Sequence, residues 1–383
     1  MYLRIITVGF ALTAGLLAAG FDWNLPEGFP RPALPSGNPM NTAKVELGRF
    51  LFYDKRISFN GKESCGSCHR QELAFTDGRA HAEGATGQLH PRSSMSLVNV
   101  AYAVYLTWAN PTLTSLEEQA LTPMLGENPV ELGLKGHEPA FLQSIRTDPV
   151  YQRLFPQAFP GETDLYTVRN VTKAIAAFER TIISVRSPYD RYRWGGDLSA
   201  ISEAAKRGEI IFSSSERGGC FQCHGGWTFS GGIRFEGSKL SSDDEEERGG
   251  FFNTGVAAYE APNRGVYEQT HRPEDIGKFR APTLRNIAVT APYMHDGSIA
   301  TLEEVIDHYA SGGRFDHPNK THILRRFSLT GTDREDLVDF LKSLTDEQLL
   351  HDPGWSDPWQ KHRQSSLAKI RVEATTLCKP IRS

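Results

Sequence analysis

Two short stretches, CGSCH at Cys65–His69 and CFQCH at Cys220–His224, decide how this 383-residue chain folds. In each, two cysteines with two residues between them are followed directly by a histidine, which is the attachment pattern of c-type haem. The two thiols bond to the haem vinyl groups, and the histidine lies beneath the iron as its proximal ligand. The residues expected to hold the two haems are Cys65, Cys68 and His69, and Cys220, Cys223 and His224.

Other uses of these motifs are less favoured. One motif alone could be a redox dithiol or half of a zinc site. The chain has two motifs, each with its histidine, and Cys378 is the only cysteine outside them. The pattern therefore favours two covalently bound haem c groups.

The residues before the two motifs are also alike. VELGRFLFYDKR (45–56) precedes the first and AAKRGEIIFSSS (204–215) precedes the second. Each is typical of an amphipathic helix with a Gly-x-x-(Leu/Ile)-Phe ending, followed by a polar loop, which indicates a weak internal duplication. Further helices are predicted at 115–125, at 164–183 and at 332–345, where Thr332 and Glu335 would form a capping box.

No alternating strand pattern stands out, so the fold class is mainly α, with two cytochrome c-like haem domains and long loops. The boundary between the domains is expected near 185–200. The predicted organisation is a signal peptide at 1–20, an N-terminal haem domain at 21–190, a C-terminal haem domain at 191–350 and a tail at 351–383.

The segment SIATLEEVIDHYASGG (298–313) predicts one more helix, with Thr301 and Glu304 as its capping box and two glycines as its stop. Four of its residues recur at helical spacing and share one face: Leu302, Val305, Ile306 and Tyr309. Tyr309 is therefore expected to point inward. A buried phenol needs a partner, because an unpaired one costs about 1–3 kcal/mol.

The sixth ligand of each iron decides what the haem does. An electron carrier closes that position with methionine or histidine, whereas a catalytic haem leaves it open. Met294, in the loop TAPYMHDGS beside His295, is the only methionine after the second motif. The residues alone leave two candidates for the second haem: Met294, which could also simply pack in its tight loop, and the inward-facing Tyr309.

The first twenty residues, MYLRIITVGFALTAGLLAAG, contain one basic residue, an apolar stretch and a small-residue end, which together predict a secretory signal peptide. A retained membrane anchor is disfavoured because the apolar run is short and no other long apolar segment follows. We therefore expect an exported, periplasmic protein without stable membrane insertion. A net charge of −4 gives no footprint for nucleic acid. The acidic run at 241–250 is interpreted as a solvated surface insertion rather than a calcium or partner site.

Beyond the two motifs, several collinear stretches carry a resemblance: LGRFLFYDKRIS, AFTDGR, SLVNVAY, SLEEQALTPM, NPVELG, FNTGV, FRAPTLRNIAVTAPYMHDGSIATLEEVI and LVDFLKSLT. Over nearly its whole mature length the chain resembles the bacterial diheme cytochrome c peroxidase and MauG family, and most of all the MauG-type enzymes of methanobactin operons. The peroxidases carry a ligating methionine where Tyr309 stands, whereas MauG-type enzymes carry a tyrosine ligand there. The resemblance thus implies a peroxide-reactive haem on His69 and a second haem ligated by His224 and Tyr309.

The same resemblance implies three catalytic residues. Glu131, in NPVELG, matches the distal carboxylate that moves the peroxide proton, although two extra residues separate it from Gln119. Gln119, in SLEEQAL, matches the amide that orients peroxide. Trp108, in YLTWANP, matches the indole between the two haems, although composition alone would favour a core aromatic.

The resemblance further implies one calcium ion between the haems, bound by Asn99 and by the carbonyls of Thr290 and Pro292. In some relatives a loop histidine occupies the sixth position of the first haem iron. Neither His81 nor His90 aligns cleanly with that histidine, so we prefer an open sixth position here. MauG carries a surface tryptophan shortly before its second haem motif, and in this chain residues 217–219 stand in that region without one. Trp227 is then a weak candidate for the route by which oxidation leaves the protein.

The function implied is that of a MauG-like diheme oxidoreductase. It would use hydrogen peroxide to form a high-valent diheme state that oxidises a tryptophan, or another side chain, of a periplasmic partner protein. One alternative is a diheme cytochrome c peroxidase that reduces hydrogen peroxide with electrons from a small cytochrome or copper protein. Another is a diheme electron carrier without catalysis, in which both irons would be six-coordinate.

Overall fold

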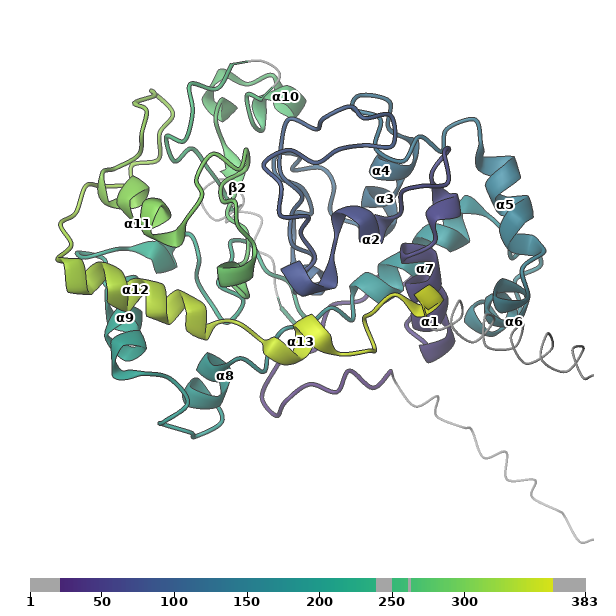
Figure 1. Ribbon diagram of the computed structural model, residues 1–383, viewed down its shortest axis with the longest axis horizontal. Coiled ribbons are helices and arrows are strands. Elements are labelled where there is room, and N and C mark those ends of the chain that lie inside the picture. The colour runs from purple at the N-terminus through teal and green to yellow at the C-terminus, as the bar shows by residue number, and fades with distance from the viewer. Residues whose placement is uncertain (1–20, 239–249, 261–262, 361–383) are drawn as a thin grey trace, which may run out of the picture.

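The computed structural model describes residues 21–238, 250–260 and 263–360. The predicted signal peptide, residues 241–249 of the acidic run and Cys378 lie outside these ranges. Two groups of helices lie side by side (Figure 1), and we call them the N-terminal lobe (α1 to α7) and the C-terminal lobe (α8 to α12). None of the described helices is long and apolar enough to cross a membrane.

The N-terminal lobe is organised around α1 and α7, which pack against each other. Their buried faces form one apolar core with the helices that follow the first motif. The lobe contains α1 (Thr42–Phe52), α2 (Cys65–Cys68), α3 (Leu116–Gln119), α4 (Leu121–Leu125), α5 (Glu138–Arg146), α6 (Pro149–Ala158) and α7 (Val168–Glu179), with the 3-10 helices η1 (Lys55–Ile57), η2 (Gln71–Leu73) and η3 (Val100–Tyr102).

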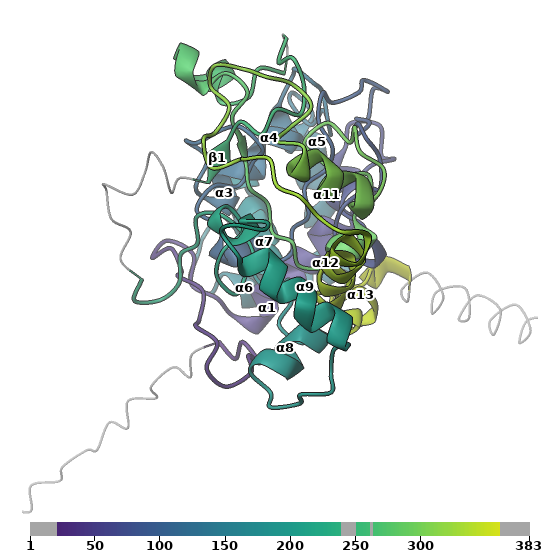
Figure 2. The ribbon, with the colours of Figure 1, turned by 90° about the vertical axis from the view of Figure 1, so that its left-hand side faces the viewer.

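The C-terminal lobe repeats this arrangement with α9 and α12 (Figure 2). It contains α8 (Pro188–Arg193), α9 (Glu203–Ser213), α10 (Tyr267–Thr270), α11 (Leu302–Ala310) and α12 (Gly331–Ser343), with η4 (Cys220–Gln222), η6 (Pro273–Asp275) and η7 (Ile287–Val289). Its strands, β1 (Phe251–Phe252) and β2 (Phe279–Arg280), form a short antiparallel pair. Mainly helical structure is therefore confirmed, with this small ribbon as the addition that alternation did not predict.

One glycine in each lobe lets the two main helices cross closely. A Cβ atom on Gly48 of α1 would lie 1.9 Å from the carbonyl oxygen of Ala174 in α7. A Cβ atom on Gly208 of α9 would lie 2.0 Å from the carbonyl oxygen of Asp336 in α12. No real side chain tolerates such distances, so the glycine of each Gly-x-x-(Leu/Ile)-Phe pattern is required by packing. The internal duplication predicted from the sequence is thus visible as a repeated helix crossing.

A second repeated feature joins the lobes. Asn99 and Asn286 each precede a 3-10 helix, η3 or η7, and each has a φ of 59°, a left-handed conformation that asparagine tolerates better than most residues. Asn99 Nδ2 donates to the Ser184 carbonyl at 3.2 Å, and Asn286 Nδ2 donates to Ser184 Oγ at 2.9 Å. Both asparagines therefore meet at one residue in the connection between α7 and α8.

The predicted helix ends are right in some places and wrong in others. The capping box of Thr301 and Glu304 at the start of α11 is confirmed. The predicted box of Thr332 and Glu335 is wrong: α12 begins earlier, and Thr330 caps it together with Asp333. The helix predicted at 115–125 is split into α3 and α4 at Ala120, and the one at 164–183 is shortened to α7.

After α12 the chain returns to the N-terminal lobe through α13 (Glu347–His351), drawn in yellow below the junction of the lobes in Figure 1. Gln71 Nε2 donates to the carbonyls of Leu349 and Asp352, both at 2.8 Å. Tyr53 donates to the Trp355 carbonyl at 2.7 Å. The described part of the predicted tail, residues 351–360, therefore packs on the N-terminal lobe.

Candidate active site

The first CxxCH motif is held by a short helix and one directed hydrogen bond. Ser64 and Ser67 form a capping box at the start of α2, and His69 ends the helix. The His69 Nδ1 atom lies 2.8 Å from the Phe75 carbonyl oxygen, which can only accept, so Nδ1 carries the proton. Burial lowers the pKa of His69 and keeps the ring neutral. The lone pair is thus on Nε2, the nitrogen available to bind a metal.

The second motif has the same chemistry. His224 Nδ1 lies 3.0 Å from the Pro282 carbonyl oxygen and 3.3 Å from that of Phe229, so it donates and Nε2 keeps the lone pair. Burial lowers the pKa of His224 as well. Both histidines are therefore oriented as proximal metal ligands usually are, by a backbone acceptor on the other ring nitrogen.

A cavity of about 760 Å³ opens beside the second motif and falls within the size range of small-molecule and cofactor sites. Its walls include the second motif, the loop containing Met294 and the inner face of α11. All four residues predicted to share that face line the cavity: Leu302, Val305, Ile306 and Tyr309. The inward orientation of Tyr309 is therefore confirmed.

Tyr309 and Met294 both line the cavity, so its geometry allows either residue to be the sixth ligand of the second haem. Burial is the main cause that raises the pKa of Tyr309 well above its usual range, while a side-chain hydrogen bond with Thr254 opposes that shift. The phenol is thus neutral here, and a metal ion would have to lower its pKa for it to bind as a phenolate. Met294 has a φ of 72°, unusual for a non-glycine residue, which fixes it in a tight turn.

The residues present fit a covalent haem c at each motif. The four motif cysteines are free thiols, and each histidine presents its metal-binding nitrogen. Within the described ranges, no group of three or more His, Cys, Asp or Glu side chains is placed to hold a metal ion by itself. The haem interpretation therefore stands on donor type and orientation at both motifs, and on available space at the second.

Glu131 lies close enough to the first motif for its charge to contribute, after burial, to raising the pKa of the thiols of Cys65 and Cys68. Burial raises the pKa of Glu131 itself to about 7, so the carboxyl can both take up and release a proton near neutrality. Gln119 ends α3 and is half-buried. Glu131 is half-buried rather than fully exposed.

Trp108 lines the cavity and connects the lobes. Its indole Nε1 donates to the Ser93 carbonyl at 2.9 Å, and its own carbonyl accepts from the Arg280 amide at 2.8 Å. The His295 ring lies edge-on to it, with ring centres 6.5 Å apart. Trp108 is thus held by residues of both lobes, and its role between the two haems remains a prediction.

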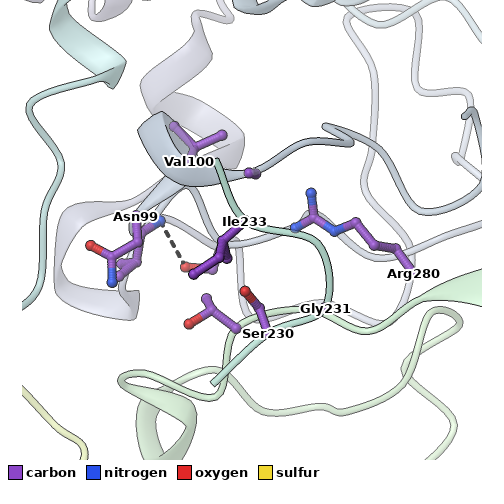
Figure 3. A pocket seen from close by; sticks show the side chains of 10 residues that line it. Asn99, Val100, Ser230, Gly231, Ile233 and Arg280 are labelled. Carbon is purple, nitrogen blue, oxygen red and sulfur yellow. Dashed lines mark hydrogen bonds between the residues drawn. The ribbon is translucent and has the colours of Figure 1, made fainter. Parts of the chain in front are cut away.

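The predicted calcium ligands lie near the lobe junction. The Asn99 side-chain oxygen accepts from the Ser184 amide at 2.9 Å, which leaves one of its two lone pairs for another donor. Asn99 also lines a small pocket with Ser230 and Arg280 (Figure 3). Thr290 and Pro292 follow η7, and the peptide bond before Pro292 is cis. The calcium ion itself remains a prediction.

Three residues of this site were not predicted as functional from the sequence. His295 is buried, lines the cavity and stacks on Phe279 with ring centres 3.6 Å apart, yet it drew attention only as the neighbour of Met294. Arg280 lines both the cavity and the small pocket and donates to the Tyr105 carbonyl. Burial lowers the pKa of Arg280 to about 10, because desolvation disfavours the charged guanidinium. Tyr259 also lines the cavity. Arg280 and His295 lie in a stretch that carried the resemblance and Tyr259 lies outside every such stretch, and no local pattern marked any of the three side chains.

His81 and His90 lie together in the loop after the first motif, where His81 Nδ1 lies 3.2 Å from the His90 carbonyl oxygen. His81 is exposed, and burial and the charge of Arg92 lower the pKa of His90. Neither has a described contact with His69.

Comparison with known proteins gives this site its family. Residues 42–198 match the family model described as di-haem cytochrome c peroxidase. The chain is 37% identical to a cytochrome-c peroxidase of Denitromonas iodatirespirans, over 91% of this chain and 94% of that protein. It belongs to the di-haem cytochrome c peroxidase and MauG family, whose members are oxidoreductases that carry two c-type haems.

Two further similarities place it within that family. The chain is 33% identical to the methylamine utilization protein MauG of Methylorubrum extorquens, over 84% of this chain and 83% of that protein. The crystal structure of a MauG-like protein associated with microbial copper homeostasis is 41% identical, with a TM-score of 0.82, over 89% of this chain and all of that one. The diheme peroxidase BthA from Burkholderia thailandensis, with a TM-score of 0.63 at 20% identity, shares the fold.

Proposed function

We propose that this chain is a MauG-type enzyme that uses hydrogen peroxide to oxidise a tryptophan side chain of a periplasmic partner protein. The observation that carries the proposal is that Tyr309 faces the same cavity as the second CxxCH motif. A phenolate is a hard, anionic ligand that favours oxidised iron, whereas a thioether favours reduced iron. A site with Tyr309 as ligand is suited to hold an oxidising equivalent, and poorly suited to accept electrons from a donor.

In this proposal each lobe binds one haem, with residues 21–190 forming one domain and 191–350 the other. Haem would supply the reaction with peroxide and the storage of two oxidising equivalents. His69 and His224 would hold the two haem irons through Nε2, each oriented by a backbone carbonyl at Nδ1. The scheme does not require the calcium ion, but Asn99, Thr290 and Pro292 would hold it at the junction of the lobes.

The chain's own residues supply proton transfer and connection. Glu131 takes up the peroxide proton, because its pKa of about 7 allows both protonation states at neutral pH. Gln119 orients peroxide from the end of α3. Trp108 connects the two centres through an indole that residues of both lobes hold in place.

The partner is a protein with an accessible tryptophan. The MauG-like relative is associated with microbial copper homeostasis, and we extend that setting to the partner of this chain. Export through the N-terminal leader would bring enzyme and partner together in the periplasm.

The alternative, a cytochrome c peroxidase, rests on Met294, which lines the same cavity as Tyr309. A Met294 ligand would raise the potential of the second haem and make it an entry point for electrons. A relative named as a cytochrome-c peroxidase is among the most similar proteins, which supports this alternative.

Electron paramagnetic resonance of the ferric holoprotein separates these functions. We expect one high-spin and one low-spin signal, and in Tyr309→Phe a change confined to the low-spin one. Steady-state turnover with peroxide and reduced cytochrome c should be slow in the wild type. Fast turnover, together with an unchanged low-spin signal in Tyr309→Phe and a changed one in Met294→Leu, would establish the peroxidase function instead.

A further inference from the structure

An exposed tryptophan belongs to a series of aromatic contacts behind the second motif, in which it also meets Phe29 at 5.2 Å. Trp194 follows α8, and 47% of its surface is exposed. Its ring lies edge-on to Tyr189, with ring centres 5.8 Å apart. Indole is among the most easily oxidised side chains, so an exposed one in contact with a buried tyrosine can exchange electrons between the interior and the surface.

A chain of aromatic contacts links Tyr189 to the cavity. It packs edge-on against Phe229 at 5.4 Å, and Phe229 packs against Phe212 at 5.8 Å. Phe212 lines the cavity next to the second motif. Two phenylalanine rings therefore lie between the Tyr189 ring and the site where the second haem would bind.

The phenol of Tyr189 has a proton acceptor already in place. Its hydroxyl donates to Glu209 Oε1 of α9 at 2.7 Å. Burial, followed by this carboxylate, raises the pKa of Tyr189 and keeps the phenol protonated at rest. When a phenol loses an electron its proton becomes strongly acidic, so Glu209 can accept it across the existing hydrogen bond. The oxidised tyrosine would then be a neutral radical that places no new charge in the core.

Trp227, which the sequence left as a candidate for the exit route, is unsuited to the same role. Its indole Nε1 is buried with no hydrogen-bond partner among the described residues, so an oxidised ring could not release its proton. The guanidinium carbon of Arg285 lies 5.8 Å from the ring centre, and Arg285 is fully buried. Arg285 is itself paired with Asp190, at 2.7 and 2.8 Å, so the lack of a proton acceptor is what makes Trp227 unsuited.

We propose that Tyr189 and Trp194 form the route by which oxidation leaves the C-terminal lobe, with Glu209 as the proton acceptor. This inference rests on the proposed function, in which peroxide is the oxidant. Tyr189 gives one electron to the oxidised C-terminal site and its proton to Glu209. The tyrosyl radical then takes an electron from Trp194 and recovers its proton from Glu209, while Trp194 releases its indole proton to solvent.

Trp194 is restored by an electron from the partner's tryptophan, together with a proton from solvent. Reduction of one hydrogen peroxide to two waters takes up two electrons and two protons. Two one-electron transfers along this route supply those two electrons. The route therefore delivers two one-electron oxidations to the partner through one exposed residue.

The test is peroxide treatment of the holoprotein without a partner, followed by peptide mapping of oxidised tryptophan and by radical detection with electron paramagnetic resonance. Without a partner the oxidation should remain on Trp194, so we expect oxygenated Trp194 in the wild type. In Tyr189→Phe and Glu209→Gln the yield of that product should fall by about tenfold or more, since proton-coupled oxidation of the relay is removed. Trp194→Phe should lose the tryptophan radical signal.

Two matched variants serve as controls. Tyr192→Phe changes the other tyrosine of α8, whose ring centre lies 6.3 Å from that of Tyr189. Trp355→Phe changes a half-buried tryptophan that donates to the Thr181 carbonyl in the N-terminal lobe. Both should retain the Trp194 product.

The outcomes separate this inference from the proposed function. Normal peroxide consumption with unmodified Trp194 in the wild type, or an unchanged Trp194 yield in both Tyr189→Phe and Glu209→Gln, would overturn the route alone. A wild-type holoprotein that does not react with peroxide would overturn the proposed function, and the route with it. Because Glu209→Gln keeps the side-chain shape, it tests the route even if Tyr189→Phe disturbs the core.

Discussion

Replacement of Glu131 by glutamine tests the site through both stability and rate. Burial raises the pKa of this carboxyl from 4.5 to about 7, so the folded protein prefers the protonated form. A group whose pKa is higher in the folded state destabilises the fold as pH rises through the interval between the two values. At about 1.4 kcal/mol for each pH unit, the interval corresponds to roughly 3 kcal/mol.

Glutamine stays neutral at every pH, so Glu131→Gln should not lose stability as the pH rises. The variant and the wild type should have similar free energies of unfolding near pH 4. By pH 8 the variant should be more stable by up to roughly 3 kcal/mol, an upper limit because the side chain is only half-buried. Denaturant unfolding of the holoproteins at several pH values measures this difference. Glu118→Gln, a change of an exposed carboxyl on α3, is the control and should show no such trend.

Glu131→Gln should react with peroxide more slowly than the wild type, although it is more stable at high pH. Only the ionised carboxyl can accept a proton, so the wild-type rate should rise with pH through about 7. Glu131→Gln should be slower by about 100-fold or more above that pH, and its rate should not follow the same titration. Stopped-flow absorbance measures both. A variant with the wild-type rate and profile, or a stability difference that does not grow with pH, would refute the assignment of Glu131.

Three further predictions follow from the same structure. Tyr309→Met should keep both haems attached and should change the absorption and paramagnetic spectra of the second haem only; unchanged spectra would exclude Tyr309 as a ligand. Trp108→Phe should lose the hydrogen bond to Ser93, about 0.5–1.5 kcal/mol of stability, and should lower the yield of partner oxidation while haem content stays constant. Gly208→Ala should lower the free energy of unfolding by about 1–3 kcal/mol despite alanine's better helix propensity, because its Cβ would meet the Asp336 carbonyl; a stabilised variant in denaturant unfolding would contradict the close crossing.

Local sequence patterns predicted the parts of this molecule that local interactions determine. The inward position of Tyr309 follows from helical spacing and a capping box, which involve residues within a few positions of one another. The start of α12 was missed because SLTGTDRE contains two overlapping capping patterns, Thr330 with Asp333 and Thr332 with Glu335. Periodicity does not distinguish starts two residues apart, and the observed choice depends on packing of α12 against α9.

Contacts between distant residues could not be predicted in this way. Arg280 donates to Tyr105, which is 175 positions away, and Tyr189 meets Glu209 across two helices. No spacing rule connects such pairs, since they are determined by how the lobes and helices pack. The resemblance supplied Trp108 and Glu131 because a family pattern carries long-range information that one sequence does not display.

The duplication explains how the same scaffold can serve two different sites. The residues that fix the backbone are repeated: a glycine at each main helix crossing and a histidine bonded to a carbonyl after each motif. The residues that would face the reacting groups are not repeated. A carboxyl with a raised pKa lies near the first motif, whereas a buried phenol lines the cavity of the second. In the proposed function the lobes would therefore share one mode of haem attachment and differ in proton chemistry at the first centre and in stabilisation of oxidised iron at the second. Trp108, held by the Ser93 carbonyl and the Arg280 amide, is the residue that we propose connects the two centres.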